Sequence, residues 1–452
     1  MTKEKELLVL CNYAVSTGMK AGATAVESLV QSQNDLDAEI ELSQINTVNQ
    51  RTGTEIAIRL FIGKRMGSAF TNIPTKESVK DAVQLAIAAA RVTTEDEDWI
   101  SFPQPQDYSA VEGLWHSDVV KTKPSEIVNL TGRLITNAIA SEPSLVVIGG
   151  GSGTSSFTRA YANSNGVKCA ESGTVAYLAE AAIAQTESGA TPYVQAYDVG
   201  RNLSLDLEDT VERVAEKIRA CKTKAKGKTG KYPVVFHPGA YSQLFNYTLM
   251  ESVRGDNVAR GKSKIADKIG DVIASELFTL VDDGLVPGGA ATSIADDEGV
   301  PRQRTPIVEK GILRSFLWDT YWANKMGVQS TGNARRSMRQ GLVEIGKTTI
   351  IVESGTRTIE EIIASLDYGY YVLDVQGAHS SNPESGDFSI VGNPAFLIEN
   401  GKLIGAVDGL MVSGNIFDVL RNIVEVAKNP IKLLSWMAPE IVVSSVNITA
   451  KE

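Results

Sequence analysis

Residues 234–261, VVFHPGAYSQLFNYTLMESVRGDNVARG, are the stretch from which the fold of the second half can be worked out. Residues 234–236 predict a buried strand, which His237-Pro238-Gly239 closes. An amphipathic helix is expected next, over about residues 241–254, because apolar side chains recur there at helical spacing. These side chains are Tyr241, Leu244, Phe245, Thr248 and Leu249.

The overall composition is that of an ordinary globular protein. The chain has 452 residues, of which 43% are hydrophobic and 22% charged, enough for two or three domains with sizeable cores. The net charge of −10 argues against a nucleic-acid-binding surface, which needs clustered Lys and Arg. One dense basic run, residues 222–231, is interpreted as a solvated linker.

Cysteine usage and hydropathy predict a cytoplasmic protein. Cys11, Cys169 and Cys221 are far apart and form no CxxC pair, so they indicate neither a disulfide framework nor a cysteine-based zinc site. The first 23 residues predict an amphipathic helix rather than a signal peptide. No stretch approaches the roughly 20 apolar residues that cross a bilayer.

The first half predicts alternating helices and strands. Leu7, Leu8, Cys11, Ala14 and Val15 make one face of the first helix. Strands are expected at residues 36–43, 54–63, 145–148 and within 155–187, and further helices at about 75–92, 125–140 and 205–222.

The second half predicts many strands with interspersed helices. Asn400-Gly401 is a strong hairpin signal, and residues 309–311 predict another turn. Helices are expected at 318–326, 358–365 and 415–427. We therefore predict a mixed α/β (α+β) protein of two domains, residues 1–225 with a sheet and helices and residues 226–452 rich in strands, with the boundary near 222–231.

Two glycine-rich segments imitate nucleotide-binding loops. Residues 341–348, GLVEIGKT, match the P-loop pattern, but the β-branched run after Thr348 predicts a strand where that loop requires a helix. Residues 149–153, GGGSG, do not have dinucleotide-loop spacing and are interpreted as a turn between strands.

Three polar segments could carry function, and each has a simpler interpretation. Residues 296–299, DDEG, could hold Ca²⁺ but are better explained as a turn. Arg335-Arg336 could bind a substrate carboxylate, although an exposed pair without that role is the simpler interpretation. In the loop 377–387, His379, Asn382 and Asp387 either line a binding cleft or satisfy turn backbone groups.

Several runs together resemble the TldD/PmbA family, proteins once called modulators of DNA gyrase. In the first half GKRMGSAFTN and AYANSNG fit this family. In the second half the matching text is residues 234–261, 311–334, 377–405 and 414–429.

The resemblance implies an incomplete metal site. TldD-type members carry an HExxxH zinc motif on the helix described above, and its positions fall on Asn246, Tyr247 and Glu251. Asn is a poor zinc ligand, and Tyr cannot replace a carboxylate base at neutral pH. The C-terminal Cys ligand of TldD-type members is also missing, because Cys221 is the last cysteine. Since positions five apart on an ideal helix differ by about 140°, Asn246 and Glu251 would not converge without local distortion.

This departure matches the PmbA (TldE) branch. The resemblance then implies a zinc-free subunit with no metal and no catalytic residue of its own, paired with a zinc-bearing TldD-like subunit that hydrolyses unfolded or modified peptides. His379, Asn382, Asp387 and Arg335 would be candidates for the peptide cleft, and a homodimer is expected when the partner is missing.

Two alternatives stay open. The chain could be an autonomous metallopeptidase with a relocated site, for which Glu251, His237 and His379 are the available ligands. It could also be a non-enzymatic, protein-binding modulator of DNA gyrase.

Overall fold

The computed structural model describes residues 2–187 and 189–451. Residues 25–62 form one long hairpin, in which β1 (Ala25–Glu41) pairs with β2 (Gln44–Ile62) along its whole length. Leu42 and Ser43 make the turn, with positive φ of 48° and 60°. The two short strands expected at 36–43 and 54–63 were therefore bounded wrongly. The polar residues 44–53 also lie in the strand, at an end that is largely exposed.

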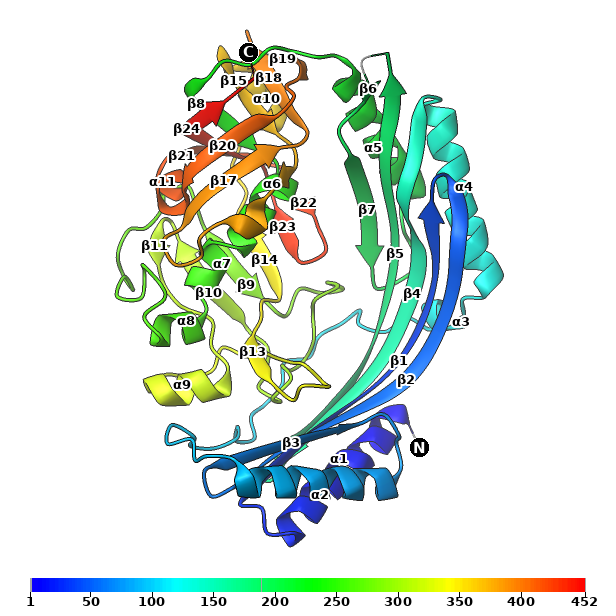
Figure 1. The fold of residues 1–452 in the computed structure, drawn as a ribbon, viewed down its shortest axis with the longest axis vertical. Coiled ribbons are helices and arrows are strands. Elements are labelled where there is room, and N and C mark those ends of the chain that lie inside the picture. Colours follow the sequence, from blue (N-terminus) through cyan, green and yellow to red (C-terminus); the bar gives the residue numbers. More distant parts are fainter. Residues whose placement is uncertain (1, 188, 452) are drawn as a thin grey trace.

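The hairpin is part of a curved antiparallel sheet. The strand order is β3-β2-β1-β4-β5-β6, with β7 paired to β5. The long strands wrap around the second half of the chain (Figure 1). The additional strands are β3 (Arg65–Thr71), β4 (Leu145–Asn163), β5 (Lys168–Thr186), β6 (Gly189–Ala190) and β7 (Val194–Gly200).

The glycine run 149–153 lies inside β4, so the prediction of a turn there is wrong. The neighbouring strands approach this segment so closely that side chains do not fit. A Cβ on Gly150 would lie 2.2 Å from the carbonyl oxygen of Ala179, and one on Gly151 would lie 2.0 Å from that of Ala38. Both residues also have positive φ, 115° and 144°, which glycine adopts without strain. The glycines therefore permit an irregular central strand.

Four long helices cover one face of this sheet. They are α1 (Lys3–Lys20), α2 (Lys76–Val92), α4 (Pro124–Ser141) and α5 (Leu207–Lys222), and the short α3 (Ser117–Lys121) precedes α4. All four were expected at these positions. On β1, Val26 and Val30 pack under α1 and α2, and Ile40 packs with the core of α4 and α5. The alternate residues, such as Glu27, point to the opposite face, where the second half of the chain lies.

The second half contains two larger mixed sheets and a small hairpin. One sheet has the order β16-β17-β20-β24-β8-β15-β18-β19 with β21 on β24, the other β11-β10-β9-β14-β23-β22, and β12 pairs with β13. The mixed α/β fold class is thereby confirmed. The strands are β8 (Gly230–Phe236), β9 (Leu280–Asp283), β10 (Arg304–Glu309), β11 (Ile312–Leu313), β12 (Ala334–Arg336), β13 (Val343–Ile345), β14 (Thr349–Val352), β15 (Tyr368–Val372), β16 (Val375–Gln376), β17 (Asp387–Gly392), β18 (Ala395–Glu399), β19 (Lys402–Ala406), β20 (Leu410–Asn415), β21 (Ile423–Val426), β22 (Ile431–Lys432), β23 (Trp436–Ala438) and β24 (Ile441–Thr449).

The turns of this half follow the sequence closely. Asn400-Gly401 joins β18 to β19 and Lys310-Gly311 joins β10 to β11, with positive φ at all four residues. Helices α9 (Thr320–Met326) and α10 (Ile359–Ala364) were also expected. The P-loop was rightly rejected, because Thr348 leads directly into β14.

The helix expected at 415–427 is too long. Helix α11 (Ile416–Arg421) ends early, and β21 follows it. The β-branched residues of this short run pair with β24 instead of continuing the helix. Among the described residues, no helix is long and apolar enough to cross a membrane.

Glu180 on β5 provides a test of this packing. Its side chain is only 1% exposed, and its neighbours on the same face, Leu178 and Ala182, belong to the core beneath α4 and α5. Within the described residues neither carboxyl oxygen has a hydrogen-bond partner. Burial raises the pKa of Glu180 to about 8.

We expect Glu180→Met to stabilise the protein by an amount that grows with pH. Because the folded-state pKa lies above the unfolded value, folding stability is lost as pH rises from about 4.5 towards 8, at up to about 1.4 kcal/mol per pH unit. Urea unfolding at pH 5.5, 7 and 8.5 measures this. Glu216→Met on the exposed face of α5 is the control, and a gain independent of pH would contradict the assignment.

Candidate functional site

The strand–turn–helix run at 234–261 differs from the expected single helix. Helix α6 (Pro238–Asn246) is capped at its N-terminus by His237, whose Nδ1 accepts a hydrogen bond from the Gly239 N–H at 3.0 Å. It ends at Asn246, and α7 (Leu249–Ser252) and α8 (Gly255–Ala259) follow. The prediction of one helix over 241–254 is therefore wrong.

The break between α6 and α7 lies at a buried threonine, Thr248. Thr248 has φ −131° and ψ −84°, outside the helical region. Its hydroxyl donates to the carbonyl oxygen of Leu244 at 2.7 Å, a local bond that Thr side chains often make in competition with the helix. The break falls between Asn246 and Glu251, so it supplies the kind of distortion that positions five apart need if they are to face one ion.

A lysine lies at the degenerate motif. The Lys347 Nζ donates to the Asn246 Oδ1 at 2.6 Å. Burial lowers the pKa of Lys347, and the carboxylates of Asp282 and Glu251 oppose this effect. Residues from both sides of the helix break, Asn246 and Glu251, therefore act on the same ammonium group.

The other two motif positions, Tyr247 and Glu251, contact the side chains of His379, Arg254 and Asn257. Tyr247 is 46% exposed, and its ring centroid lies 6.4 Å from that of His379. The Glu251 carboxylate accepts from the Asn257 Nδ2 at 3.1 Å and pairs with Arg254 at 3.4 Å. Tyr247 and Glu251 therefore both lie outside the hydrophobic core.

The donor set around α6 does not fit zinc. Asn246 offers a neutral amide oxygen, and the adjacent ammonium of Lys347 would repel a divalent cation. His237 lies at the opposite end of α6, where burial lowers its pKa to about 3. Nowhere in residues 2–187 and 189–451 do three or more His, Cys, Asp or Glu side chains form a group that could hold a metal ion.

In the loop around His379, the side chains of Asn382 and Asp387 make hydrogen bonds within the loop and to Asn415. Asn382 Oδ1 accepts from the backbone N–H groups of Glu384 and Ser385 at 2.9 and 3.0 Å. Asp387 accepts from Asn415 and Ser385, and these bonds lower the pKa of its carboxyl group. His379 is exposed on a short 3₁₀ turn (Ala378–Ser380). A role for this loop in a peptide cleft stays a prediction.

Arg335 and Arg336 have opposite environments, although they were interpreted as one exposed pair. Arg335 is exposed on β12, and its role as a cleft residue also stays a prediction. The side chain of Arg336 is fully buried and forms an ion pair with Glu27 of β1. The interpretation of Arg336 as exposed is wrong, because alternation along β12 turns it towards the curved sheet.

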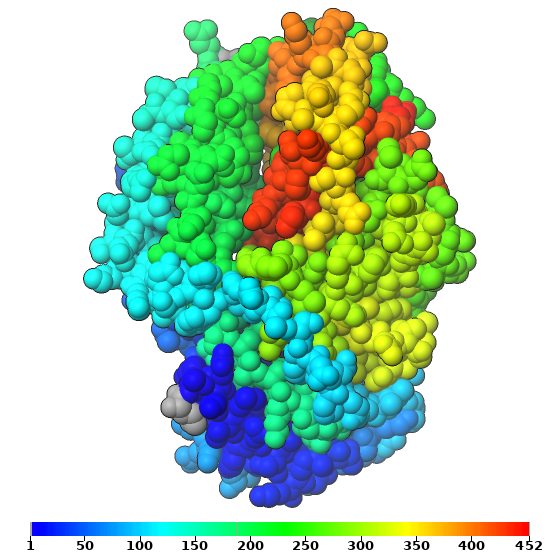
Figure 2. Space-filling model, turned by 180° about the vertical axis from the view of Figure 1, so that it is seen from behind, coloured from blue at the N-terminus to red at the C-terminus, as the bar shows by residue number. Residues whose placement is uncertain are grey.

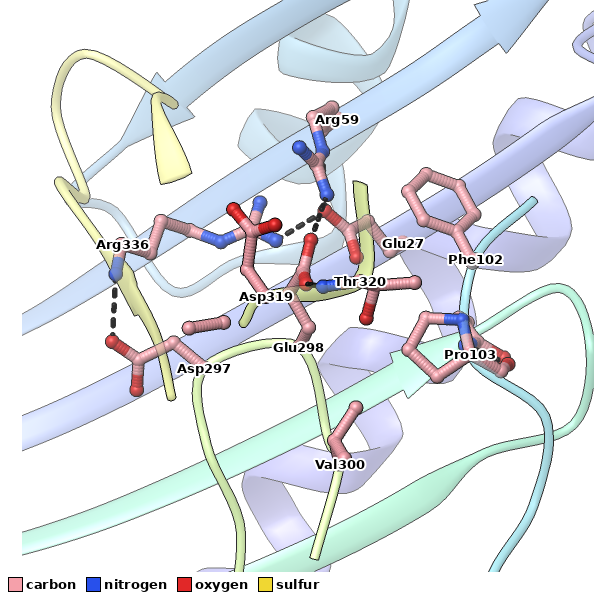
Figure 3. A network of polar contacts seen from close by, with 12 residues as sticks. Glu27, Arg59, Phe102, Pro103, Asp297, Glu298, Val300, Asp319, Thr320 and Arg336 are labelled. Carbon is pink, nitrogen blue, oxygen red and sulfur yellow. Dashed lines mark hydrogen bonds and ion pairs between the residues drawn. The ribbon is translucent and has the colours of Figure 1, made fainter. Parts of the chain in front are cut away.

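Arg336 belongs to a polar network that joins the two halves of the chain (Figure 3). Arg59 on β2 bridges Glu27 at 2.6 Å and Glu298 at 2.7 Å. Glu298 also accepts from the Thr320 N–H at 3.0 Å, at the start of α9. We call Glu27, Arg59, Glu298 and Arg336 the interdomain ion cluster.

Two further carboxyl groups lie beside this cluster. Burial, with the neighbouring charge of Glu298, raises the pKa of Asp319 to about 8. Burial likewise raises the pKa of Asp296 to about 7.

Asp297, the next residue along the chain, pairs with Arg159 of β4 at 2.9 Å. The run 296–299 does form a turn, as expected, with Gly299 at φ 75°. The ion pairs of its carboxylates with Arg59 and Arg159 were missed, because they join segments far apart in the sequence.

These features define the class of the protein: a mixed α/β chain in which a curved antiparallel sheet wraps around two further sheets, with a polar site at the C-terminal end of α6. Family models of the PmbA/TldA metallopeptidase match in three segments, domain 1 at residues 26–90, the central domain at 117–222 and the C-terminal domain at 229–450. The chain belongs to the PmbA/TldD family.

Three relatives illustrate the match. The crystal structure of TldE from Thermococcus kodakarensis superposes with a TM-score of 0.93 at 33% identity, covering 98% of this chain and 100% of that one. Metalloprotease PmbA of Escherichia coli O157:H7 is 26% identical over 92% of this chain and 91% of its own length. A metalloprotease TldD homolog of Buchnera aphidicola subsp. Acyrthosiphon pisum is 33% identical, but over only 43% of this chain and 40% of its own.

We expect Arg336→Met to destabilise the protein by about 3–5 kcal/mol, because it leaves Glu27 buried with one of its two cationic partners removed. The exposed neighbour on the same strand is a matched control: Arg335→Met should change the unfolding free energy by about 0.5 kcal/mol or less. Urea unfolding of both variants measures the difference. Equal effects of the two substitutions would show that the interdomain ion cluster does not stabilise the fold.

Proposed function

We propose that this chain is the zinc-free, PmbA/TldE-like subunit of a TldD/TldE-type metallopeptidase complex that hydrolyses unfolded or modified peptides. The full-length likeness to TldE is the observation that carries the proposal. The partial match to the TldD homolog, set against the nearly full-length match to PmbA, supports the same branch.

The chemistry around α6 supports a role without catalysis. Hydrolysis by a zinc-bound water needs metal ligands and a base that accepts the proton of the water. Here Asn246 and Tyr247 occupy the positions of a ligand and the base, and Lys347 places an ammonium group beside them. In the proposed complex a TldD-like partner supplies the zinc and the catalytic carboxylate.

This chain would contribute a wall of the peptide cleft. Tyr247 and His379 form an exposed aromatic pair next to the degenerate motif. Such a pair can contact peptide side chains while offering the hydrogen-bonding groups of a phenol and an imidazole. We place the complex in the cytoplasm, and we infer that the chain forms a homodimer when the partner is missing.

The first experiment compares the chain purified alone with the chain co-expressed with a TldD-like subunit. We expect almost no zinc and no peptide hydrolysis from the chain alone, and both from the complex. Elemental analysis after chelator-free purification gives the zinc content, and cleavage of an unfolded peptide gives the activity.

In the complex, Tyr247→Ala should weaken peptide binding and raise KM without removing zinc.

Two outcomes would replace the proposal. About one zinc per lone chain, lost together with activity in Glu251→Gln and His379→Ala, would establish an autonomous metallopeptidase. Salt-independent co-purification with DNA gyrase, without any TldD-like subunit, would establish a gyrase modulator instead. A matched control is Glu276→Gln, a change of an exposed carboxylate away from the motif that should leave zinc and activity unchanged.

A further inference from the structure

A cavity of about 380 Å³ lies between the two halves of the chain, near the start of α6. Strand β7 and helix α5 form one wall, and α6, the segment after β15 and the loop between β22 and β23 form the other. Figure 2 shows the molecule hollowed between the green segment of β7 and α5 and the red segment near β22. The volume is within the roughly 300–1,000 Å³ typical of small-molecule sites. Its polar lining includes Gln195, Arg213, Lys217, His237, Gln243 and Asp374.

Lys217 brings a positive charge to this cavity. Its Nζ donates to the carbonyl oxygen of Gln195 at 2.7 Å. An ammonium has three donors, and within the described chain this is the single hydrogen bond recorded for it. Burial, and then the charge of Arg213, lowers the pKa of Lys217 to about 8, so the group is still mostly protonated at neutral pH.

Arg213 adds to the positive potential. It donates to the carbonyl oxygen of Tyr197 at 3.1 Å and pairs with Asp209 at 2.7 Å. His237 contributes no charge, because burial, together with Lys217 and Arg213, lowers its pKa to about 3. An anion entering the cavity would relieve the repulsion between Lys217 and Arg213.

A hydrogen-bond acceptor lies on the other side of Gln195. The Asp374 carboxyl group accepts from the side chains of Gln243 at 2.5 Å and Gln195 at 3.3 Å, and from the Val375 N–H at 2.7 Å. Gln195 thus accepts a hydrogen bond from Lys217 at its backbone carbonyl oxygen, and its side-chain Nε2 donates one to Asp374. The Lys217 ammonium, which can donate to an anion, and the Asp374 carboxyl group, which can accept from an N–H group, are therefore both held by Gln195.

We propose that this cavity binds an α-carboxylate with its adjacent nitrogen, either of a free amino acid or of the C-terminal residue of a peptide. Lys217 and Arg213 bind the carboxylate, and Asp374 accepts a hydrogen bond from the amino or amide nitrogen. The apolar part of the wall, which includes Val194, Leu373 and Leu433, contacts the side chain of the ligand. The site lies at the N-terminal end of α6, whereas Asn246 lies at its C-terminal end. The proposal needs only this chain and is independent of the subunit role.

The test is isothermal titration of the full-length chain with leucine, N-acetylleucine and leucinamide. We expect leucine or N-acetylleucine to bind, and leucinamide, which lacks the carboxylate, to bind at least about tenfold more weakly. Binding of N-acetylleucine alone would identify a peptide C-terminus as the ligand, and binding of leucine would identify a free amino acid. Equal binding of all three, or binding of none, would overturn the proposal.

Variants locate the binding. Lys217→Met should weaken carboxylate binding by about tenfold or more, and Asp374→Asn should weaken leucine more than N-acetylleucine. Leu433→Trp fills the cavity from its half-buried rim and should abolish binding while the charged groups stay in place. Lys428→Met, at an exposed position outside the cavity, is the control. Unchanged affinity in both Lys217→Met and Leu433→Trp would overturn the assignment of the site.

Discussion

The arrangement of the whole molecule depends on burying charge between its two halves. The curved sheet presents Glu27 and Arg59 on the face opposite its four helices, and the second half presents Glu298 and Arg336 to them. Charges removed from water in this way are tolerated only when each has a partner of opposite sign. The interdomain ion cluster therefore fixes how the C-terminal sheets sit in the curve of the N-terminal one. The cavity at Lys217 is lined by both halves and therefore takes its shape from that arrangement.

The region around α6 keeps an ordinary strand–helix framework, while the side chains at the end of the helix do not fit a zinc ion. The strand β8, the N-terminal cap at His237 and the buried face of α6 form an ordinary packing unit. The helix break at Thr248 lies where two ligands five residues apart would need it. What differs from a zinc site is chemical: the Asn246 amide stands at one ligand position, the Tyr247 phenol at the position of the base, and the Lys347 ammonium lies beside them. Of the three motif positions, Glu251 alone keeps a carboxylate. The family framework is thus retained although the side chains at the end of α6 do not suit zinc.

Much of the fold could be predicted from the sequence, where local signals were strong. The four helices over the first sheet, the Asn400-Gly401 hairpin and the strand after Thr348 all follow from periodicity and turn chemistry. The failures were places where tertiary contacts decide. The glycines at 149–153 look like a turn until two neighbouring strands are placed against them, and Thr248 looks like an apolar helix position until its hydroxyl bonds to Leu244. In the candidate site, the contact of Lys347 with Asn246 joins residues about a hundred positions apart, and no local pattern reports such a pair. The burial of Arg336 beside an exposed Arg335 was missed for the same reason.

The ammonium of Lys347 also differs from a metal ion in being covalently attached to the chain. A bound zinc ion comes from a shared cellular supply, competes with other divalent metals and can be removed by chelators. A lysine side chain is made with the protein and is present in every copy. In the proposed zinc-free subunit, folding of the segment from α6 to α8 would therefore need no metal delivery, and the chain would not compete for zinc with the proposed partner.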